Sequence, residues 1–160
     1  MGSGFGAIYD LKSSLGEKSV SEKSLRFYSE KDERLESYFQ RMLSRKQEED
    51  ASYSRNMIST AQHYEMNEKG LFGKPGKSRD IRIISSEDPM GTAMDFFSKI
   101  SEGAKAETMN NGSALYCNLN DGVRINFRPY SSTPDSPAID ICIKVLDKIQ
   151  KIHFVLRGLV

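Results

Sequence analysis

The chain has 160 residues, of which 38% are hydrophobic and 28% are charged, and its formal net charge at pH 7 is +1. This composition lies within the globular range, and no segment approaches the roughly 18 apolar residues that a membrane span requires. The near-neutral charge argues against a broad cationic face that binds nucleic acid non-specifically, and residues 1–6 lack the basic and apolar regions of a Sec signal peptide.

The length allows one ordinary domain, or a compact domain of roughly 90 residues preceded by a helical extension. We favour the second arrangement, because a segment rich in glycine and proline, residues 70–76, interrupts the chain. Segments of this composition end regular structure. The sequence therefore predicts a helical N-terminal region, residues 1–70, followed by an α+β domain, residues 71–160.

The N-terminal region is expected to contain two helices. Residues 2–18 are rich in glycine and serine and too sparse in apolar side chains to predict an element. From Ser21 onward, apolar residues recur mostly at three- and four-residue spacing, which predicts an amphipathic helix of several turns. The same pattern is weaker in residues 50–67, where we predict a second helix. The apolar residues of the first helix are Leu25, Tyr28, Leu35, Tyr38, Phe39, Met42 and Leu43.

The C-terminal domain is expected to be an α+β structure in which one helix packs on a small antiparallel sheet. A short strand is predicted at residues 80–84, and Asp88-Pro89 is typical of a helix start. Gly103 ends this helix. Alternating apolar residues then predict five more strands, and Asp121-Gly122 predicts a tight hairpin because both residues tolerate positive φ. The five strands are residues 105–109, 114–118, 123–128, 138–145 and 151–156.

The two cysteines and two histidines show no metal-site pattern. Cys117 and Cys142 fall in different predicted strands, where a disulfide would require those strands to be neighbours in register. We interpret both as small buried side chains. His63 and His153 have no ligand-like spacing and no CxxC motif occurs, so a structural zinc site has no support. No cofactor is expected, and metal binding through carboxylates alone is left open.

A basic segment follows the predicted domain boundary. Lys74, Lys77, Arg79 and Arg82 are accompanied by a single acidic residue, Asp80, between residues 71 and 84. A cluster of this kind forms either a solvated loop or an edge that contacts phosphates. We take its four cations as candidate RNA-binding residues.

The segment from residue 121 to residue 143 places an arginine, several hydroxyls and two carboxylates around a loop between two predicted strands. RNA cleavage without a metal needs one group to take the 2′-hydroxyl proton, another to protonate the leaving oxygen, and donors that stabilise the phosphorane. Arg128 would bind the scissile phosphate through its planar guanidinium. Ser131 and Ser132 would add hydroxyl donors, and Tyr130 would stack a base.

A histidine and an aspartate complete this candidate catalytic set. His153, with an unperturbed pKa near 6.5, would act as general acid or base if its strand lies beside Arg128. Asp140 would orient it. Each residue also has a structural interpretation, since Arg128 can pair with Asp135 or Asp140 on the surface. A lone histidine in a strand is often structural, and the loop serines and tyrosine serve equally as turn formers and local packing.

The order of these pieces resembles a known family. Residues 121–132 read Asp-Gly-Val-Arg-Ile-Asn-Phe-Arg-Pro-Tyr-Ser-Ser, residues 137–141 read Pro-Ala-Ile-Asp-Ile, and residues 151–154 read Lys-Ile-His-Phe. Over roughly its last 50 to 80 residues the chain resembles the C-terminal ribonuclease domains of bacterial polymorphic and contact-dependent inhibition toxins, the barnase/EndoU/colicin/RelE-like (BECR) group. It departs in the spacer at residues 133–136, at Ala138 where threonine is usual, and at His153 where arginine is common.

The resemblance implies a metal-independent ribonuclease toxin that cleaves tRNA or another structured RNA by attack of the 2′-oxygen on the adjacent phosphate. It also implies a cognate immunity protein, and delivery by a specialised system into the cytoplasm of a target bacterium. Two other functions stay open. One is a non-catalytic adaptor or inhibitor that binds a protein through its helical N-terminal half. The other is a toxin that cleaves DNA or modifies nucleotides.

Overall fold

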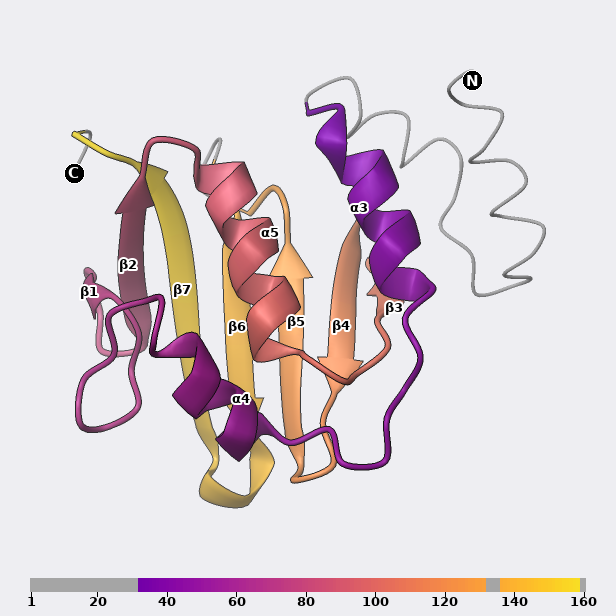
Figure 1. The fold of residues 1–160 in the computed structure, drawn as a ribbon. Helices are drawn as coiled ribbons and strands as arrows, with labels where there is room; N and C mark the ends of the chain where they lie inside the picture. The colour runs from indigo at the N-terminus through magenta and orange to yellow at the C-terminus, as the bar shows by residue number, and fades with distance from the viewer. Residues whose placement is uncertain (1–31, 132–135, 159–160) are drawn as a thin grey trace.

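The computed structural model describes residues 32–131 and 136–158, which form three α-helices and a seven-stranded sheet (Figure 1). The fold is therefore α+β, as the sequence predicts. The helices are α3 (Arg34–Leu43), α4 (Tyr53–Thr60) and α5 (Pro89–Ile100). The strands are β1 (Lys74–Pro75), β2 (Ile81–Ser86), β3 (Glu107–Met109), β4 (Ala114–Asn118), β5 (Val123–Arg128), β6 (Ala138–Ile143) and β7 (Lys148–Leu156).

The sheet is larger than predicted and mixed in direction. Its strand order is β1-β2-β7-β6-β5-β4-β3. Strands β3 to β7 form an antiparallel meander, and β7 ends beside β2, with which it pairs in parallel. Helix α5 follows β2 and crosses the sheet before the meander begins at the opposite edge (Figure 1). Strand β2, early in the C-terminal region, thus lies beside its last strand, β7.

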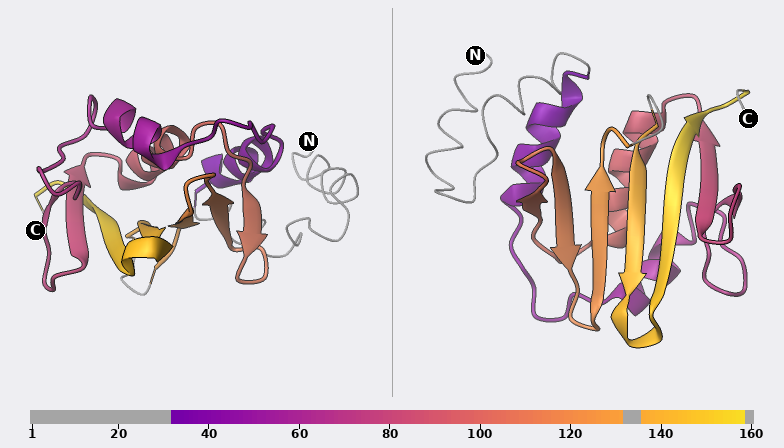
Figure 2. Two further views of the ribbon diagram at one scale, coloured as in Figure 1. Left: turned by 90° about the horizontal axis from the view of Figure 1, so that it is seen from below. Right: turned by 180° about the vertical axis from the view of Figure 1, so that it is seen from behind.

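All three described helices cover the same face of the sheet (Figure 1). No helix of the described residues covers the opposite face, as the view from behind shows (Figure 2). We call it the open face. Because successive side chains of a strand point to opposite faces, each strand divides its residues between the helical layer and the open face.

The hydrophobic core lies between the helices and the sheet. In β5 the burial alternates, with Val123, Ile125 and Phe127 buried on the helical side. Phe127 stacks on Phe97 of α5 with ring centroids 5.5 Å apart, and it contacts Tyr38 of α3 edge-on at 5.8 Å. Helix α3 therefore packs into the same core as the C-terminal strands. The division into two domains at residue 70 stays a prediction.

Local capping explains where α5 and α4 begin. The Asp88 side chain accepts a hydrogen bond from the Gly91 amide at 3.1 Å, and Pro89 occupies the first turn, as predicted. At α4, Asp121 of the β4–β5 hairpin accepts hydrogen bonds from the amides of Tyr53 and Ser54 at 3.1 and 3.0 Å. The hairpin residue predicted from the sequence therefore also caps a helix far away in the chain.

The predicted elements agree with the observed ones to different extents. Helix α5 and strands β4 and β5 are confirmed within a residue or two. The two N-terminal helices are shorter where they are described, and the predicted part of the first helix before residue 32 lies outside the described residues. Strand β6 ends earlier than predicted. A 3-10 turn at Lys144–Leu146, followed by Asp147 with φ of 48°, reverses the chain there, and β7 begins earlier than predicted.

Cys117 and Cys142 are free thiols. Cys117 lies on β4 and is buried in the core, whereas Cys142 lies on β6, with β5 between the two strands. The strands are not neighbours, so the condition for a disulfide is not met. Among the described residues, no helix has both the length and the apolar character needed to cross a bilayer.

Candidate functional site

The open face brings most of the predicted catalytic residues together through the register of three neighbouring strands. Arg128 of β5 pairs with Ala138 of β6, and Ala138 pairs in turn with His153 of β7. Two residues further along β6, on the same face, Asp140 pairs with Lys151 of β7. Arg128 and His153 therefore flank Ala138, a residue with only a methyl side chain, at positions about 10 Å apart.

Arg128 and Asp140 form a two-pronged ion pair. Arg128 Nε donates to Asp140 Oδ2 at 3.0 Å, and Arg128 Nη2 donates to Oδ1 at 2.9 Å. The side chains are 25% and 10% exposed, so solvent screens this pair less than a surface pair. A guanidinium has five N–H donors, and two are used here. The other three make no hydrogen bond to a described residue and could bind a phosphate.

His153 lies beside this pair and makes no hydrogen bond in the described part of the chain. Its Nδ1 is buried without a partner. Both carboxylate oxygens of Asp140 are occupied by Arg128, and the carboxylate makes no hydrogen bond to the imidazole. The structure thus places Asp140 as the partner of Arg128, one of the two pairings that the sequence left open, and does not show the predicted contact in which Asp140 orients His153.

Burial and charge act together on the imidazole. The pKa of His153 is lowered below its usual value of 6.5, first by burial and then by the positive charge of Arg128. The negative charge of Asp140 opposes this effect in part. At neutral pH the ring is therefore uncharged, which is the form that accepts a proton.

The loop between β5 and β6 is fastened next to His153. Ser131 Oγ donates to the Ser136 carbonyl at 2.6 Å, and Ser136 Oγ donates to the Phe154 carbonyl at 3.2 Å. The Phe154 amide in turn donates to the Pro137 carbonyl at 2.9 Å. These bonds place the Ser131 end of the loop close to β7. Ser132 lies outside the described residues.

Tyr130 and the basic segment are less closely connected to this site. Tyr130 is half-buried and packs against the hydrophobic core. Lys74 forms an ion pair with Glu65 at 3.3 Å on exposed β1. Lys77 and Arg79 are exposed in the turn before β2.

Arg82 does not reach the open face. Its side chain is on the helical side of β2, 7% exposed, and donates to the carbonyls of Phe72 and Gly73 at 2.9 and 2.8 Å. This guanidinium holds the segment before β1 in place. We expected Arg82 at an exposed edge that binds phosphate, and this prediction is wrong. Successive residues of β2 point to opposite faces of the sheet, and residue 82 points to the buried face.

Four open-face residues were missed by the sequence predictions. Lys151 is next to Asp140, while Asn126 and Arg124 precede Arg128 on the same strand and face. Tyr116 of β4 pairs with Asn126. Strand alternation within residues 123–128 was sufficient to find Asn126 and Arg124, whereas Tyr116 and Lys151 required the strand order.

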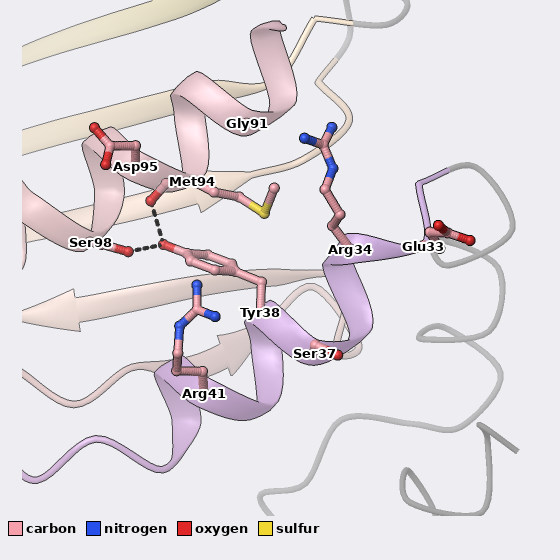
Figure 3. A pocket seen from close by; sticks show the side chains of 9 residues that line it. All are labelled: Glu33, Arg34, Ser37, Tyr38, Arg41, Gly91, Met94, Asp95 and Ser98. Atoms are coloured by element: carbon pink, nitrogen blue, oxygen red, sulfur yellow. Dashed lines mark hydrogen bonds between the residues drawn. The ribbon is translucent and has the colours of Figure 1, made fainter. Parts of the chain in front are cut away.

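A separate groove of about 740 Å³ lies between α3 and α5 (Figure 3). Tyr38 crosses it and donates to the Met94 carbonyl at 2.8 Å. Arg34 at its rim is held by ion pairs with Asp32 and Asp88. No histidine or cysteine lines this groove, so its chemistry suits packing or binding better than proton transfer. The predicted catalytic residues Arg128, Asp140 and His153 do not line this groove.

Comparisons with known proteins identify no relative. No family model matches the chain, and no curated protein or solved structure is significantly similar to it. Within the described residues, no group of three or more histidine, cysteine and carboxylate side chains is arranged to hold a metal ion. Function is therefore inferred from the residues of the open face and their geometry.

Proposed function

We propose that the chain is a metal-independent endoribonuclease toxin that cleaves tRNA or another structured RNA in a target bacterium. The observation that carries this proposal is the convergence of Arg128 and His153 on either side of Ala138, with Asp140 fixing the guanidinium. An anion clamp beside an uncharged imidazole supplies two of the three groups that this cleavage needs, namely the base for the 2′-hydroxyl and the donors for the phosphorane.

In this proposal His153 is the general base. Its Nδ1 is buried without a partner among the described residues, so we assign Nε2 as the nitrogen that meets the 2′-hydroxyl. The lowered pKa keeps the ring unprotonated at pH 7. Removal of the proton lets the 2′-oxygen attack the adjacent phosphorus, and a 2′,3′-cyclic phosphate is formed as the bond to the 5′-oxygen breaks. The departing 5′-oxygen takes a proton from water, and the protonated His153 returns its proton to the solvent.

Arg128 stabilises the charge that develops on the phosphate. Two of its donors are fixed by Asp140, which sets the plane of the guanidinium before substrate binds. Pre-oriented donors need no rearrangement during the reaction. Lys151, next to Asp140 on the open face, adds a second positive charge. The Ser131 hydroxyl already donates its one proton to the Ser136 carbonyl, so we assign it the role of holding the loop. Ser132, outside the described residues, stays a proposed hydroxyl donor.

A toxin of this kind requires an inhibitor in the cell that makes it. We propose a cognate immunity protein with an acidic surface that covers the open face. Arg124, Arg128 and Lys151 lie there with Asp140 between them, and Glu107 of β3 shares the face through its pairing with Tyr116. An acidic partner would match the three cations in the way that RNA does. Delivery into a target cell by a specialised system is part of the same proposal.

The test is incubation of the purified chain with total RNA in the presence of EDTA. We expect cleavage products that end in 2′,3′-cyclic phosphates, and no cleavage at a position where the RNA carries a 2′-deoxyribose. Expression without an inhibitor should arrest bacterial growth. Intact RNA together with unchanged growth would refute the enzymatic function.

Matched variants locate the activity on the open face. His153→Ala should reduce the cleavage rate by a factor of about 10² or more, the usual contribution of general base catalysis. Arg128→Lys should also reduce it, because the ammonium keeps the charge but loses the two-pronged geometry. Lys99→Ala removes a cation from α5 on the helical side, and should leave the rate unchanged. Melting curves check that each variant is folded.

A second function is favoured by the groove between α3 and α5 (Figure 3). A non-catalytic adaptor or inhibitor would bind a protein segment there and use the sheet as a scaffold. Substitutions of Ser37 and Ser98, which line the groove, would then weaken binding of that protein. The chain would leave RNA intact, and substitutions on the open face would have no effect.

A further inference from the structure

Tyr116, Arg124 and Asn126 form a stacked cluster on the open face that the proposed cleavage chemistry does not use. The guanidinium carbon of Arg124 lies 3.9 Å from the centroid of the Tyr116 ring. Arg124 Nε donates to Asn126 Oδ1 at 3.1 Å, and Tyr116 and Asn126 are paired across β4 and β5. We call these three residues the Tyr116 cluster.

The cluster has binding capacity left over. All three side chains are half-buried and thus partly accessible. In the described part of the chain, the Tyr116 hydroxyl and the Asn126 Nδ2 take part in no hydrogen bond. Nucleobases stack on aromatic rings and on guanidinium planes. One face of the ring and one face of the guanidinium are taken up by their contact with each other, so a base would stack on a remaining face of this pair, with N–H donors beside it.

The distance from the proposed catalytic residues suits a neighbouring nucleotide. Asn126 and Arg128 are two residues apart on β5, which separates them by about 7 Å on the same face. Tyr116 lies opposite Asn126 at about 5 Å. A phosphate bound at Arg128 would therefore leave the base of an adjoining nucleotide within reach of Tyr116.

We propose that the Tyr116 cluster is a base-binding subsite that selects the nucleotide next to the scissile phosphate in an unpaired RNA segment. The inference rests on the proposed function. Asn126 Nδ2 and Arg124 Nη1 make no hydrogen bond within the described residues, and Arg124 Nη2 donates only to the weak acceptor Met109 Sδ at 3.7 Å. These donors match a base edge made of acceptors. Guanine presents two acceptors, O6 and N7, on one edge, whereas adenine presents a donor beside N7. The subsite therefore prefers guanine to adenine, and it requires an unstacked base.

The experiment measures binding of short RNA to the full chain carrying His153→Ala, which prevents cleavage under the proposed mechanism. The probes are three oligouridines, with one guanine, one adenine or one abasic residue at the centre. We expect the guanine probe to bind most tightly. Adding Tyr116→Ala should weaken its binding about tenfold or more, within the range for loss of one base stack, and should bring the three probes to similar affinity.

Tyr116→Phe is the matched control, because it keeps the ring and removes only the hydroxyl. It should retain the preference for a base over the abasic residue. Arg124→Gln should weaken binding of the guanine probe more than of the abasic probe. Melting temperatures separate this effect from the loss of the cross-strand contact, because a purely structural role would lower stability without changing the preference among the probes.

The outcomes separate this subsite from the cleavage activity. Equal affinities of the Tyr116→Ala and Tyr116→Phe chains for all three probes would overturn the subsite, even if the wild-type chain cleaves RNA. Absence of RNA binding would overturn it as well. Base-dependent binding that is lost in Tyr116→Ala would support it, including the case in which the wild-type chain fails to cleave RNA and the proposed catalytic function is wrong.

Discussion

At the scale of residues, the Arg128–Asp140 pair determines the electrostatics of the site. Its partial burial places it between a surface ion pair, which contributes little, and a fully buried one, in which loss of one partner is costly. The pair fixes the guanidinium and lies next to the imidazole. Substitutions in it should therefore change both stability and the ionisation of His153.

Asp140→Asn should lower the free energy of unfolding by about 1–3 kcal/mol, since the two charged hydrogen bonds to Arg128 are weakened while the side-chain volume is kept. Urea denaturation provides the measurement. Asp50→Asn is the control, because its pair with Arg55 is exposed on the surface, and it should cause no measurable change. Equal effects of the two substitutions would contradict the structural role of the Arg128–Asp140 pair.

The pKa of His153 should respond in opposite directions to the two partners. Arg128→Met removes the cation that lowers this pKa and leaves the Asp140 carboxylate, so the pKa should rise. Asp140→Asn removes the anion that raises it, so the pKa should fall further. NMR titration of the imidazole measures both shifts. Shifts of the same sign in the two variants would show that the ring does not lie between these charges.

The same ionisation predicts how stability depends on pH. In the unfolded chain His153 titrates near pH 6.5, whereas its pKa in the folded chain is lower. The unfolded state therefore binds more protons in the window below 6.5, and the contribution of this residue to stability falls as pH drops through the folded pKa. The acid limb of the rate profile should likewise lie below pH 6.5.

The sequence was sufficient to propose Arg128, Asp140 and His153 but not to assign their contacts. Alternation within strands identified the face of each residue, whereas the Arg128–Asp140 pairing depends on the register between β5 and β6. For Arg82 the sequence predicted the wrong surroundings. A cation in a polar segment is expected at the surface, yet two backbone carbonyls brought close by the fold bind it in the core.

At the scale of elements, the pairing of β1 with β2 requires the backbone at Gly73 to lie close to the backbone at Ile83 of β2. This residue has φ of 70°, and a Cβ atom there would lie 2.3 Å from the Ile83 carbonyl oxygen. Gly122 in the β4–β5 hairpin has a similar φ of 79° but no atom within 4 Å of such a Cβ. Both glycines thus have a positive φ that would strain any residue with a Cβ atom, and they differ in the space available for a side chain.

Gly73→Ala should therefore destabilise the protein more than Gly122→Ala. The positive φ alone costs about 1–2 kcal/mol for an alanine, and both variants should show it. In Gly73→Ala the contact with backbone adds a further loss, because a carbonyl in a paired strand cannot move away freely. Thermal unfolding of both variants tests this expectation. A loss in Gly122→Ala equal to or greater than that in Gly73→Ala would contradict the close approach.

Elements with local signals were the ones predicted well. Asp88, Pro89 and Gly103 mark both ends of α5, and the Asp121–Gly122 turn fixes the β4–β5 hairpin. The capping of α4 by Asp121 had no such signal, because it joins residues 67 and 68 positions apart. Contacts between distant segments leave no periodic pattern in the sequence.

At the scale of the whole molecule, the parallel pairing of β2 with β7 closes the fold. Periodicity predicted both strands but not their order, since a strand's alternation does not identify its neighbour. The same limit applies to the helical region. The apolar stripe of α3 predicted that the helix packs against another part of the protein but did not identify which part. In the structure α3 packs into the core between the helices and the sheet.

We expect α3 and the sheet to unfold together. Leu35→Ala, at a side chain that is 0% exposed in this core, should lower the free energy of unfolding by about 2–5 kcal/mol. The aliphatic control is Ile58→Ala on α4, where the side chain is 64% exposed, and little change is expected. Unfolding followed by fluorescence and by circular dichroism should give coincident transitions. A separate early transition in Leu35→Ala would instead indicate an independent N-terminal region.

The most direct test of the central claim is chemical-shift mapping with an oligonucleotide that carries 2′-deoxyribose at every position and so cannot be cleaved by 2′-hydroxyl attack. If the open face of the sheet binds nucleic acid (Figure 2), the amide signals of Asn126, Arg128, Lys151 and His153 should shift most. Shifts that are confined to Ser37, Ser98 and their neighbours in the groove between α3 and α5 would contradict it.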